Sequence, residues 1–370
     1  MLSRLGRWSF QNPRKVFGAW VVLGIVVIGS AVTIGAAFNA PFEIPDSESR
    51  RGYQALDTHF GGSGSGQRGL IVFRADIGVD DPAVRMPMEA LFAEVTMIDG
   101  VIVSSPYELN GAGQVNGDRT IAFASLTLAP DLDFTDTADI GMEIVELSPQ
   151  VDGLQIEVGG QALAPFEPPE SEFIGLAFAV VVLILAFGSV IAMGLPIAVA
   201  VTGVGVGAGL IMLLSNLMPM PDFTITLGAM LGLGVGIDYS LFVVTRYREG
   251  LDEGRSPLES TVKAMDTAGR AVIFAGLTVV ISLLGMLVTE LAFVTGLAIG
   301  AATTVALIVV ASITLLPALL GFARERLEVT RWRALVAAGL VSLALLGVGL
   351  GLRPLLFAGA LALVVYVAGA

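Results

Sequence analysis

Seven apolar runs, each close to the length needed to cross a lipid bilayer, constrain this chain more than any other feature of its sequence. A membrane-spanning helix needs about 20 apolar residues because the hydrocarbon core is about 30 Å thick. The run from Phe173 to Pro221 is long enough for two spans, and the stretch from Gly188 to Pro196 predicts a tight turn that divides it. We therefore predict an α-helical integral membrane bundle of six spans followed by an additional pair. The runs are Val16–Phe38, Phe173–Pro221, Phe223–Thr245, Ala271–Thr289, Phe293–Phe322, Ala334–Leu352 and Pro354–Ala370.

The charged residues that remain are concentrated in one segment. The chain is 55% hydrophobic and only 14% charged, too apolar for a water-soluble protein of 370 residues. Residues 39–171 nevertheless carry 22 Asp and Glu against 6 Lys and Arg. An acidic soluble segment argues against nucleic acid as a partner, because phosphate binding needs concentrated positive charge. The sequence has no cysteine, which excludes disulfides, a thiol nucleophile and cysteinyl metal sites.

Lysine and arginine cluster at three places beside the predicted spans. With six alternating crossings all three clusters fall on one side of the membrane, which the positive-inside rule makes cytoplasmic. The N-terminus is then cytoplasmic, and residues 39–171 are extracytoplasmic. The clusters are Arg4, Arg7, Arg14 and Lys15 before the first span, Arg246, Arg248, Arg255, Lys263 and Arg270 between the fourth and fifth, and Arg324, Arg326, Arg331 and Arg333 after the sixth.

These patterns predict the domain boundaries. The uncharged stretch from Val16 to Phe42 is longer than the apolar part of a typical signal peptide, so we interpret it as a retained transmembrane helix. Residues 1–15 are expected to form a cytoplasmic amphipathic segment, 16–38 the first transmembrane helix and 39–171 the extracytoplasmic domain. Residues 172–322 are expected to form the five-helix transmembrane bundle of helices 2–6, 323–333 a basic cytoplasmic linker and 334–370 an additional transmembrane pair.

The extracytoplasmic segment alternates between strand-like and helix-like patterns. Strands are predicted near 69–74, 101–107, 120–128 and 154–159, and helices near 82–98 and 135–147. The order βαββαβ favours a ferredoxin-like α+β sandwich. The glycine-rich stretch Gly61–Gly66 lacks the Lys and Ser/Thr of a phosphate-binding loop, so we interpret it as a connector.

Asp238 is the strongest functional candidate because it lies inside a predicted span. Its Cα is about 12 Å along the helix from Arg246, the first charge at the cytoplasmic end. A carboxylate at the centre of a span costs about 2.5–3.5 kcal/mol, so the protonated form is the less costly one. We predict that Asp238 carries a proton and that Tyr239 relays or hydrogen-bonds in the same path. The alternative is a structural aspartate satisfied by a neighbouring helix.

Small and hydroxyl residues surround this candidate in the sequence. Small residues repeated every four positions let helices approach closely. We expect helix packing near the relay at Gly228, Gly232, Gly234 and Gly236. Hydroxyls at similar predicted depth are possible relay partners, although most such groups bond to their own helix backbone. These are Thr278, Ser282, Thr303 and Thr304.

No enzyme site or metal site is predicted. His59 is the only histidine, and no second ligand is suitably spaced for a metal. It is also the only base available for Ser-His-Asp chemistry, and no nucleophile elbow accompanies it. No cofactor is expected beyond a proton gradient as the energy source.

The residues around Asp238 carry a family resemblance. The stretch 232–242, Gly-Leu-Gly-Val-Gly-Ile-Asp-Tyr-Ser-Leu-Phe, resembles the fourth-helix motif of the MMPL family within the resistance-nodulation-division superfamily. Ile44–Ser49 with Leu56 and Phe60, and Arg246–Glu249 with the helix that follows, are similar to other parts of that family. The likeness covers about residues 1–333.

The resemblance implies an exporter. It implies a porter domain at residues 39–171, proton translocation at the Asp-Tyr pair, and outward movement of lipids or other hydrophobic molecules across the bacterial cytoplasmic membrane. Family members carry a second repeat with its own Asp-Tyr pair. The chain is therefore expected to be the N-terminal half of a transporter, completed by the missing C-terminal repeat or by a second copy. Two rival hypotheses are a SecDF-like protein-export motor and a non-transporting, lipid-sensing receptor or scaffold.

Overall fold

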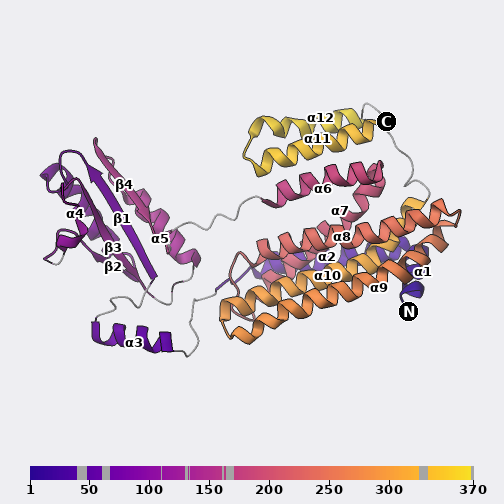
Figure 1. Cartoon of the computed structure of the whole chain (residues 1–370), viewed down its shortest axis with the longest axis horizontal. Coiled ribbons are helices and arrows are strands. Elements are labelled where there is room, and N and C mark those ends of the chain that lie inside the picture. Colours follow the sequence, from indigo (N-terminus) through magenta and orange to yellow (C-terminus); the bar gives the residue numbers. More distant parts are fainter. Residues whose placement is uncertain are drawn as a thin grey trace. The chain divides into compact units, whose positions relative to one another are not determined.

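The computed structural model describes residues 1–39, 48–60, 67–109, 111–129, 132, 134–160, 162–163, 171–324 and 332–367. The chain divides into two units (Figure 1). The helical unit comprises residues 1–38, 168–289 and 294–370, and the αβ unit comprises residues 39–167 and 290–293. The predicted connector Gly61–Gly66 and most of the predicted basic linker lie outside the described residues.

The first two helices are separated by one residue. Helix α1 (Leu2–Gln11) buries Gly6 and Phe10 against helices described below, and α2 (Pro13–Ile34) begins with a proline at its first position. Proline suits that position because its missing N–H has no helical partner there. Helix α2 ends at Gly35, whose φ of +83° lies in the region that glycine adopts without strain. The span therefore ends four residues before the predicted boundary.

The long apolar run after residue 171 is divided as predicted. Helix α6 (Ser171–Phe187) ends at Gly188, where φ is +62°, and α7 (Val190–Leu214) starts two residues later. Helix α8 (Thr224–Asp252) extends beyond the apolar stretch to its charged end. Helix α9 (Pro257–Leu284) begins at a capping box in which Ser256 and Glu259 satisfy each other's backbone N–H groups. The fifth span, predicted from Ala271, is thus the later part of a helix that begins at Pro257.

The remaining helices complete the helical unit. A 3₁₀ turn (η2, Gly285–Thr289) leads toward α10 (Ala292–Ala323), which is followed by α11 (Trp332–Gly349) and α12 (Arg353–Val367). Helices α11 and α12 lie side by side, and α11 packs on α6 (Figure 1), where Ser342 Oγ donates to Ala177 O over 2.8 Å. Helix α1 crosses the ends of α9 and α10.

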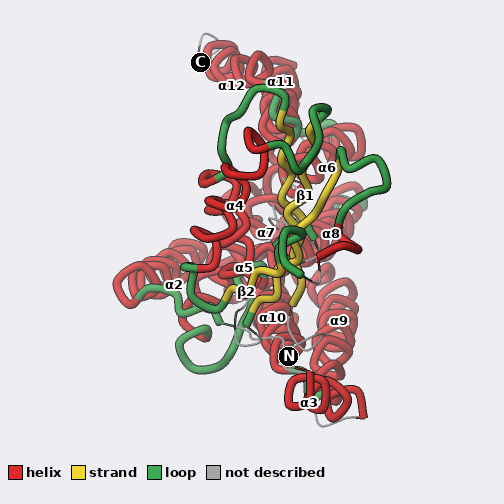
Figure 2. Tube along the Cα trace, turned by 90° about the vertical axis from the view of Figure 1, so that its left-hand side faces the viewer, coloured by secondary structure: helices red, strands yellow, loops and turns green. Residues whose placement is uncertain are grey.

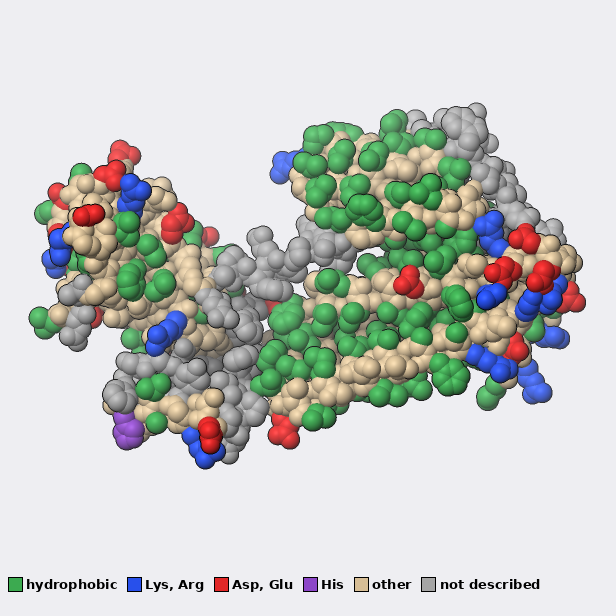
Figure 3. Space-filling view, in the orientation of Figure 1, with side chains coloured by type: hydrophobic (Ala, Val, Ile, Leu, Met, Phe, Trp, Pro, Cys, Tyr) green, Lys and Arg blue, Asp and Glu red, His purple; other side chains and the backbone are tan. Residues whose placement is uncertain are grey.

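Five of the described helices are long and apolar enough to cross a membrane: α2, α7, α8, α9 with η2, and α10. Helices α6, α11 and α12 are apolar but have shorter described stretches, so the second predicted span and the final pair do not reach that length here. Hydrophobic side chains cover the flanks of the helical unit, and most of its charged side chains gather at one end (Figure 3).

The αβ unit is built on a four-stranded antiparallel sheet. The strands are β1 (Gln67–Ala75), β2 (Val101–Ser104), β3 (Ile121–Leu128) and β4 (Leu154–Gly159), in the spatial order β2-β3-β1-β4 (Figure 1). Figure 2 shows the strands in yellow. Helices α4 (Pro82–Thr96) and α5 (Phe134–Leu147) follow β1 and β3 in the chain. The strands and helices predicted in this segment are all present. A helix that was not predicted, α3 (Glu48–Phe60), and a 3₁₀ turn, η1 (Gly111–Gln114), are added.

One face of the sheet forms the core of this unit. Alternate residues of β1, including Ile71 and Phe73, are fully buried and pack with the apolar side of α4 and α5. The rings of Phe73, Phe92 and Tyr107 lie with their centroids 6.1–6.3 Å apart. Burying such side chains supplies about 1.5–3 kcal/mol each, the usual driving force for folding in water.

Candidate functional site

Three glycines on α8 bring its neighbours within contact of its backbone. A β-carbon placed on Gly236 would lie 2.8 Å from Ala200 Cβ of α7, and one on Gly228 would lie 2.9 Å from Thr304 Oγ1 of α10. At Gly232 the same atom would be 2.8 Å from Ile308 Cδ1, also on α10. Residues four apart share one face of a helix, so this stripe is the surface on which α7 and α10 pack.

Gly234 differs from the other three glycines. A β-carbon there would meet no described atom within 4 Å. Gly234 and Asp238, one turn apart, instead line a cavity of about 310 Å³ between α6 and α8. The α6 side consists of Gly175, Leu176 and Ala179. The glycine therefore leaves space beside the carboxyl group rather than closing a helix contact.

The Asp238 side chain points to this open side. Among the described residues its carboxyl group has no hydrogen-bond donor and no ion-pair partner, and the side chain is exposed. The nearest arginines along the helix are engaged elsewhere. Arg246 pairs with Glu249 at 2.6 Å, and Arg248 donates to the carbonyl oxygen of Phe187 at 3.0 Å. No described residue therefore satisfies Asp238 in the way that the alternative of a structural aspartate requires.

Tyr239 faces a different set of helices from Asp238. Its ring carbon Cε2 lies 3.4 Å from the β-carbon position of Gly276 on α9, and the side chain is partly buried in the bundle. Successive helical residues diverge by about 100°, because 3.6 residues make one turn. The pair is therefore adjacent in sequence but turned toward separate neighbours.

The predicted hydroxyl partners do not meet the carboxyl group. Thr278 Oγ1 donates to Phe274 O at 2.8 Å, and Thr304 Oγ1 donates to Gly300 O at 3.1 Å, so both bond to their own helices. Ser282 is exposed and Thr303 half-buried, with no bond to Asp238. Thr304 does contact α8, but at Gly228, about 15 Å along the helix from Asp238.

Two buried hydroxyls were not anticipated from the sequence. Ser240 on α8 and Ser312 on α10 are fully buried, and neither Oγ has a hydrogen-bond partner among the described residues. Their neighbours pack together, since Ile308 lies against both Gly232 and Gly236. A serine in an apolar helix normally bonds back to its own turn, so no sequence signal separates these two from ordinary serines.

A metal site is not found in the described ranges, where no three Asp, Glu or His side chains come together. His59 lies on α3 with its side chain exposed. On the apolar part of α8 the structure therefore places one carboxyl group, that of Asp238, beside an open, mainly apolar cavity.

Residues 41–339 match the sequence profile of the MMPL family, and the chain belongs to that family. The resemblance carried by the Asp-Tyr stretch is thereby confirmed. The chain is 34% identical over 342 residues to "Membrane protein YdfJ" of Bacillus subtilis, covering 88% of this chain and 46% of that protein. It is 29% identical over 334 residues to "Mycolic acid-containing lipids exporter MmpL11" of Mycolicibacterium smegmatis, covering 85% and 33%.

The chain thus spans less than half the length of these relatives. Among solved structures, "Crystal structure of SecDF in Super-membrane-facing form" is similar with a TM-score of 0.43 and 14% identity, over 85% of this chain and 38% of that chain. A likeness of this extent carries no functional argument.

Proposed function

We propose that this chain is the N-terminal repeat of a transporter that exports lipids or other hydrophobic molecules across the cytoplasmic membrane, driven by the proton gradient. Membership in the MMPL family, together with a relative whose name describes lipid export, supports the transport of lipids in general. The observation that carries the proton step is Asp238, a carboxyl group without a partner among the described residues, which lines a cavity on an otherwise apolar part of α8.

The proton step follows from the cost of charge in the membrane. Inside a bilayer the neutral carboxyl is the cheaper form, and the anion is tolerated when water or a polar partner reaches it. The cavity beside Gly234 gives that access. Protonation from one side and release to the other would then bias two arrangements of the helices. Tyr239 packs against Gly276 of α9, where it would transmit the change at Asp238 to the bundle.

The αβ unit is proposed as an extracytoplasmic, ferredoxin-like porter domain. The chain order βαββαβ and the sheet order β2-β3-β1-β4 support that fold. The three basic clusters of the sequence support a cytoplasmic N-terminus and an extracytoplasmic αβ unit. Its acidic composition suits an aqueous compartment.

The open side of Asp238 is proposed to be completed by a second repeat or a second copy of this chain. A lone intramembrane carboxyl normally faces a bundle interior or a water-filled cavity and pairs with another polar group. The relatives are more than twice as long as the segment they share with this chain, which leaves room for such a repeat in them.

The test is cargo-dependent proton flux in proteoliposomes under an imposed pH gradient, with the full-length protein. Asn at position 238 is uncharged and mimics a permanently protonated aspartate, so Asp238→Asn should abolish flux. The matched control is Asp252→Asn, the same change at the exposed end of the same helix. Unchanged flux in the folded Asp238→Asn protein would contradict proton coupling and favour the lipid-sensing scaffold.

A further inference from the structure

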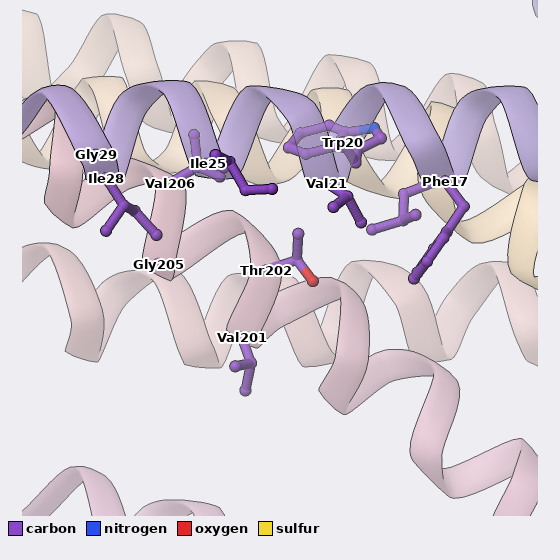
Figure 4. A pocket seen from close by; sticks show the side chains of 12 residues that line it. Phe17, Trp20, Val21, Ile25, Ile28, Gly29, Val201, Thr202, Gly205 and Val206 are labelled. Carbon is purple, nitrogen blue, oxygen red and sulfur yellow. The ribbon is translucent and has the colours of Figure 1, made fainter.

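A second cavity opens on the helical unit between α2 and α7 (Figure 4). It shares no lining residue with the cavity beside Asp238. It has a volume of about 480 Å³. A stripe of α2 from Phe17 to Gly29 forms one wall and residues 201–206 of α7 form the other, while Leu315 of α10 contributes to the lining. We call this cavity the α2–α7 groove.

The lining of the α2–α7 groove offers almost nothing to a polar ligand. Its two polar side chains are already engaged, because Trp20 Nε1 donates to Thr314 Oγ1 at 3.1 Å and Thr202 Oγ1 donates to Ala198 O at 2.7 Å. Figure 4 shows the ring of Trp20 and the side chains of Val21, Ile25 and Ile28 along α2. The chemistry of the walls is therefore that of a hydrocarbon binding site.

The length of the α2–α7 groove matches one leaflet of a bilayer. Twelve residues separate Phe17 from Gly29, which is about 18 Å along a helix, and one leaflet contributes about 15 Å of hydrocarbon. Toward its far end the helices close together, since a β-carbon on Gly209 would lie 2.9 Å from Val27 Cγ1. An extended acyl chain fits such a space, whereas a compact ligand leaves most of it empty.

A basic residue stands at the open end of the same stripe. Arg14 precedes Phe17 by three residues and Val21 by seven, the spacings that place residues on one helix face. Its side chain is exposed and forms no ion pair within the part of the chain that the structure describes. No Asp or Glu occurs before Glu43, so nothing acidic in that segment competes for Arg14.

We propose that the α2–α7 groove binds one acyl chain of an anionic phospholipid from the leaflet at the basic end of α2, with the lipid phosphate at Arg14. The positive charge of Arg14 selects an anionic headgroup, and the length and apolar walls of the α2–α7 groove select an acyl chain. The bound lipid is a component of the membrane rather than cargo, and its binding does not depend on proton coupling or transport.

The test uses Trp20 as a reporter at the groove wall. With Trp8→Phe and Trp332→Phe, Trp20 becomes the only tryptophan. The full chain is reconstituted into zwitterionic bilayers that contain a minor fraction of phosphatidylglycerol brominated on its acyl chains, and fluorescence quenching is measured. Brominated phosphatidylcholine at the same fraction gives the level of quenching expected from random neighbours. Phosphatidylglycerol should quench severalfold more strongly.

Matched variants separate the chain site from the headgroup site. A β-carbon on Gly205 meets no described atom within 4 Å, so Gly205→Leu fills the groove without displacing a helix and should reduce quenching to the random level. Gly18→Leu is the control, because Gly18 has the same open space but does not line the groove. Arg14→Gln should weaken the preference for the anionic lipid by about fivefold, and Lys15→Gln, on the adjacent face, by less.

Three results would overturn the proposal. Equal quenching by the two headgroups would mean that the groove holds ordinary surrounding lipid. Strong quenching that survives Gly205→Leu would place the lipid elsewhere near Trp20. A brominated hydrocarbon without a phosphate headgroup can be added to the same assay. If this compound quenched Trp20 and the brominated phospholipids did not, the occupant would be a hydrophobic cargo molecule and the phospholipid assignment would be wrong.

Discussion

The two units of this chain differ in where their apolar side chains lie. In the αβ unit, large side chains such as Phe73, Met88 and Leu126 are fully buried. In the helical unit Gly228, Gly232 and Gly236 of α8 lie in close contact with α7 and α10, and several valines and isoleucines on α2 point outward, with Ile25 67% exposed. Water drives apolar side chains inside, but lipid tails are as apolar as those side chains, so helices in a membrane associate by close backbone packing. The packing of the αβ unit is therefore typical of a domain in water, and the packing of the helical unit is typical of helices in lipid.

The largest effect should come from removing a core ring of the αβ unit. Phe73→Ala deletes a fully buried side chain from the centre of the sheet and should reduce the local opening free energy of β1 and β3 by about 3–5 kcal/mol. Hydrogen exchange of peptides from these strands measures this loss. Val72→Ala, on the opposite face of the same strand, is the control. Equal losses for the two variants would mean that the ring is not the centre of the core.

The helical unit should respond to the opposite change, in which a methyl group is added to a glycine. Gly236→Ala places a β-carbon against Ala200 and should cost about 1–3 kcal/mol. Gly234→Ala, two residues away on the cavity side, should be neutral or should stabilise the helix by up to about 1 kcal/mol. Thermal denaturation of both variants in the same detergent measures the difference. A Gly234→Ala protein as damaged as Gly236→Ala would contradict the division of α8 into a packed face and an open face.

The stability of the αβ unit should depend on pH in the alkaline range because of Tyr107. Partial burial is the main cause that raises the pKa of its phenol from 10.0 to about 12, and Tyr107 Oη donates to Val79 O at 2.7 Å. Below pH 10 the phenol is protonated in both folded and unfolded states. Between pH 10 and about 12 the unfolded state releases the proton first, so stability falls as pH rises through this window.

The control for this prediction is Tyr107→Phe, which removes the ionisable group and should flatten that decline. Hydrogen exchange of the αβ unit across the same pH window, corrected for the intrinsic exchange rate, reports it. A decline of the same size in the Phe variant would assign the alkaline sensitivity to other groups.

The smallest effect is expected at the serines. Ser312→Ala removes a fully buried hydroxyl without a partner among the described residues, so stability should stay level or rise by no more than about 1 kcal/mol. Ser148 Oγ in the αβ unit donates to Ile144 O at 2.8 Å, and Ser148→Ala should cost about 0.5–1.5 kcal/mol. Thermal denaturation for the first variant and hydrogen exchange for the second measure these changes. A clear loss in Ser312→Ala would show that its hydroxyl is bonded by a group outside the described residues.

Much of the architecture could be predicted from periodicity alone. The strands of the αβ unit, the turn at Gly188 and the apolar spans follow from local pattern, because side-chain spacing and glycine conformation act over a few residues. The boundaries were less predictable. Helix α9 begins at Pro257, well before the predicted span from Ala271, because a capping box at Ser256 starts one helix that includes both the charged and the apolar segment.

The sequence by itself singled out Asp238 as the candidate on α8, since an aspartate in an apolar run stands out by composition. Only the tertiary structure decided where each one points. It placed Gly228, Gly232 and Gly236 on the packed face, opened a cavity beside Gly234, and kept the predicted hydroxyl partners away from Asp238. The reason is that a helix repeats its faces every 3.6 residues, whereas the neighbour that covers each face is set by packing between segments far apart in the chain.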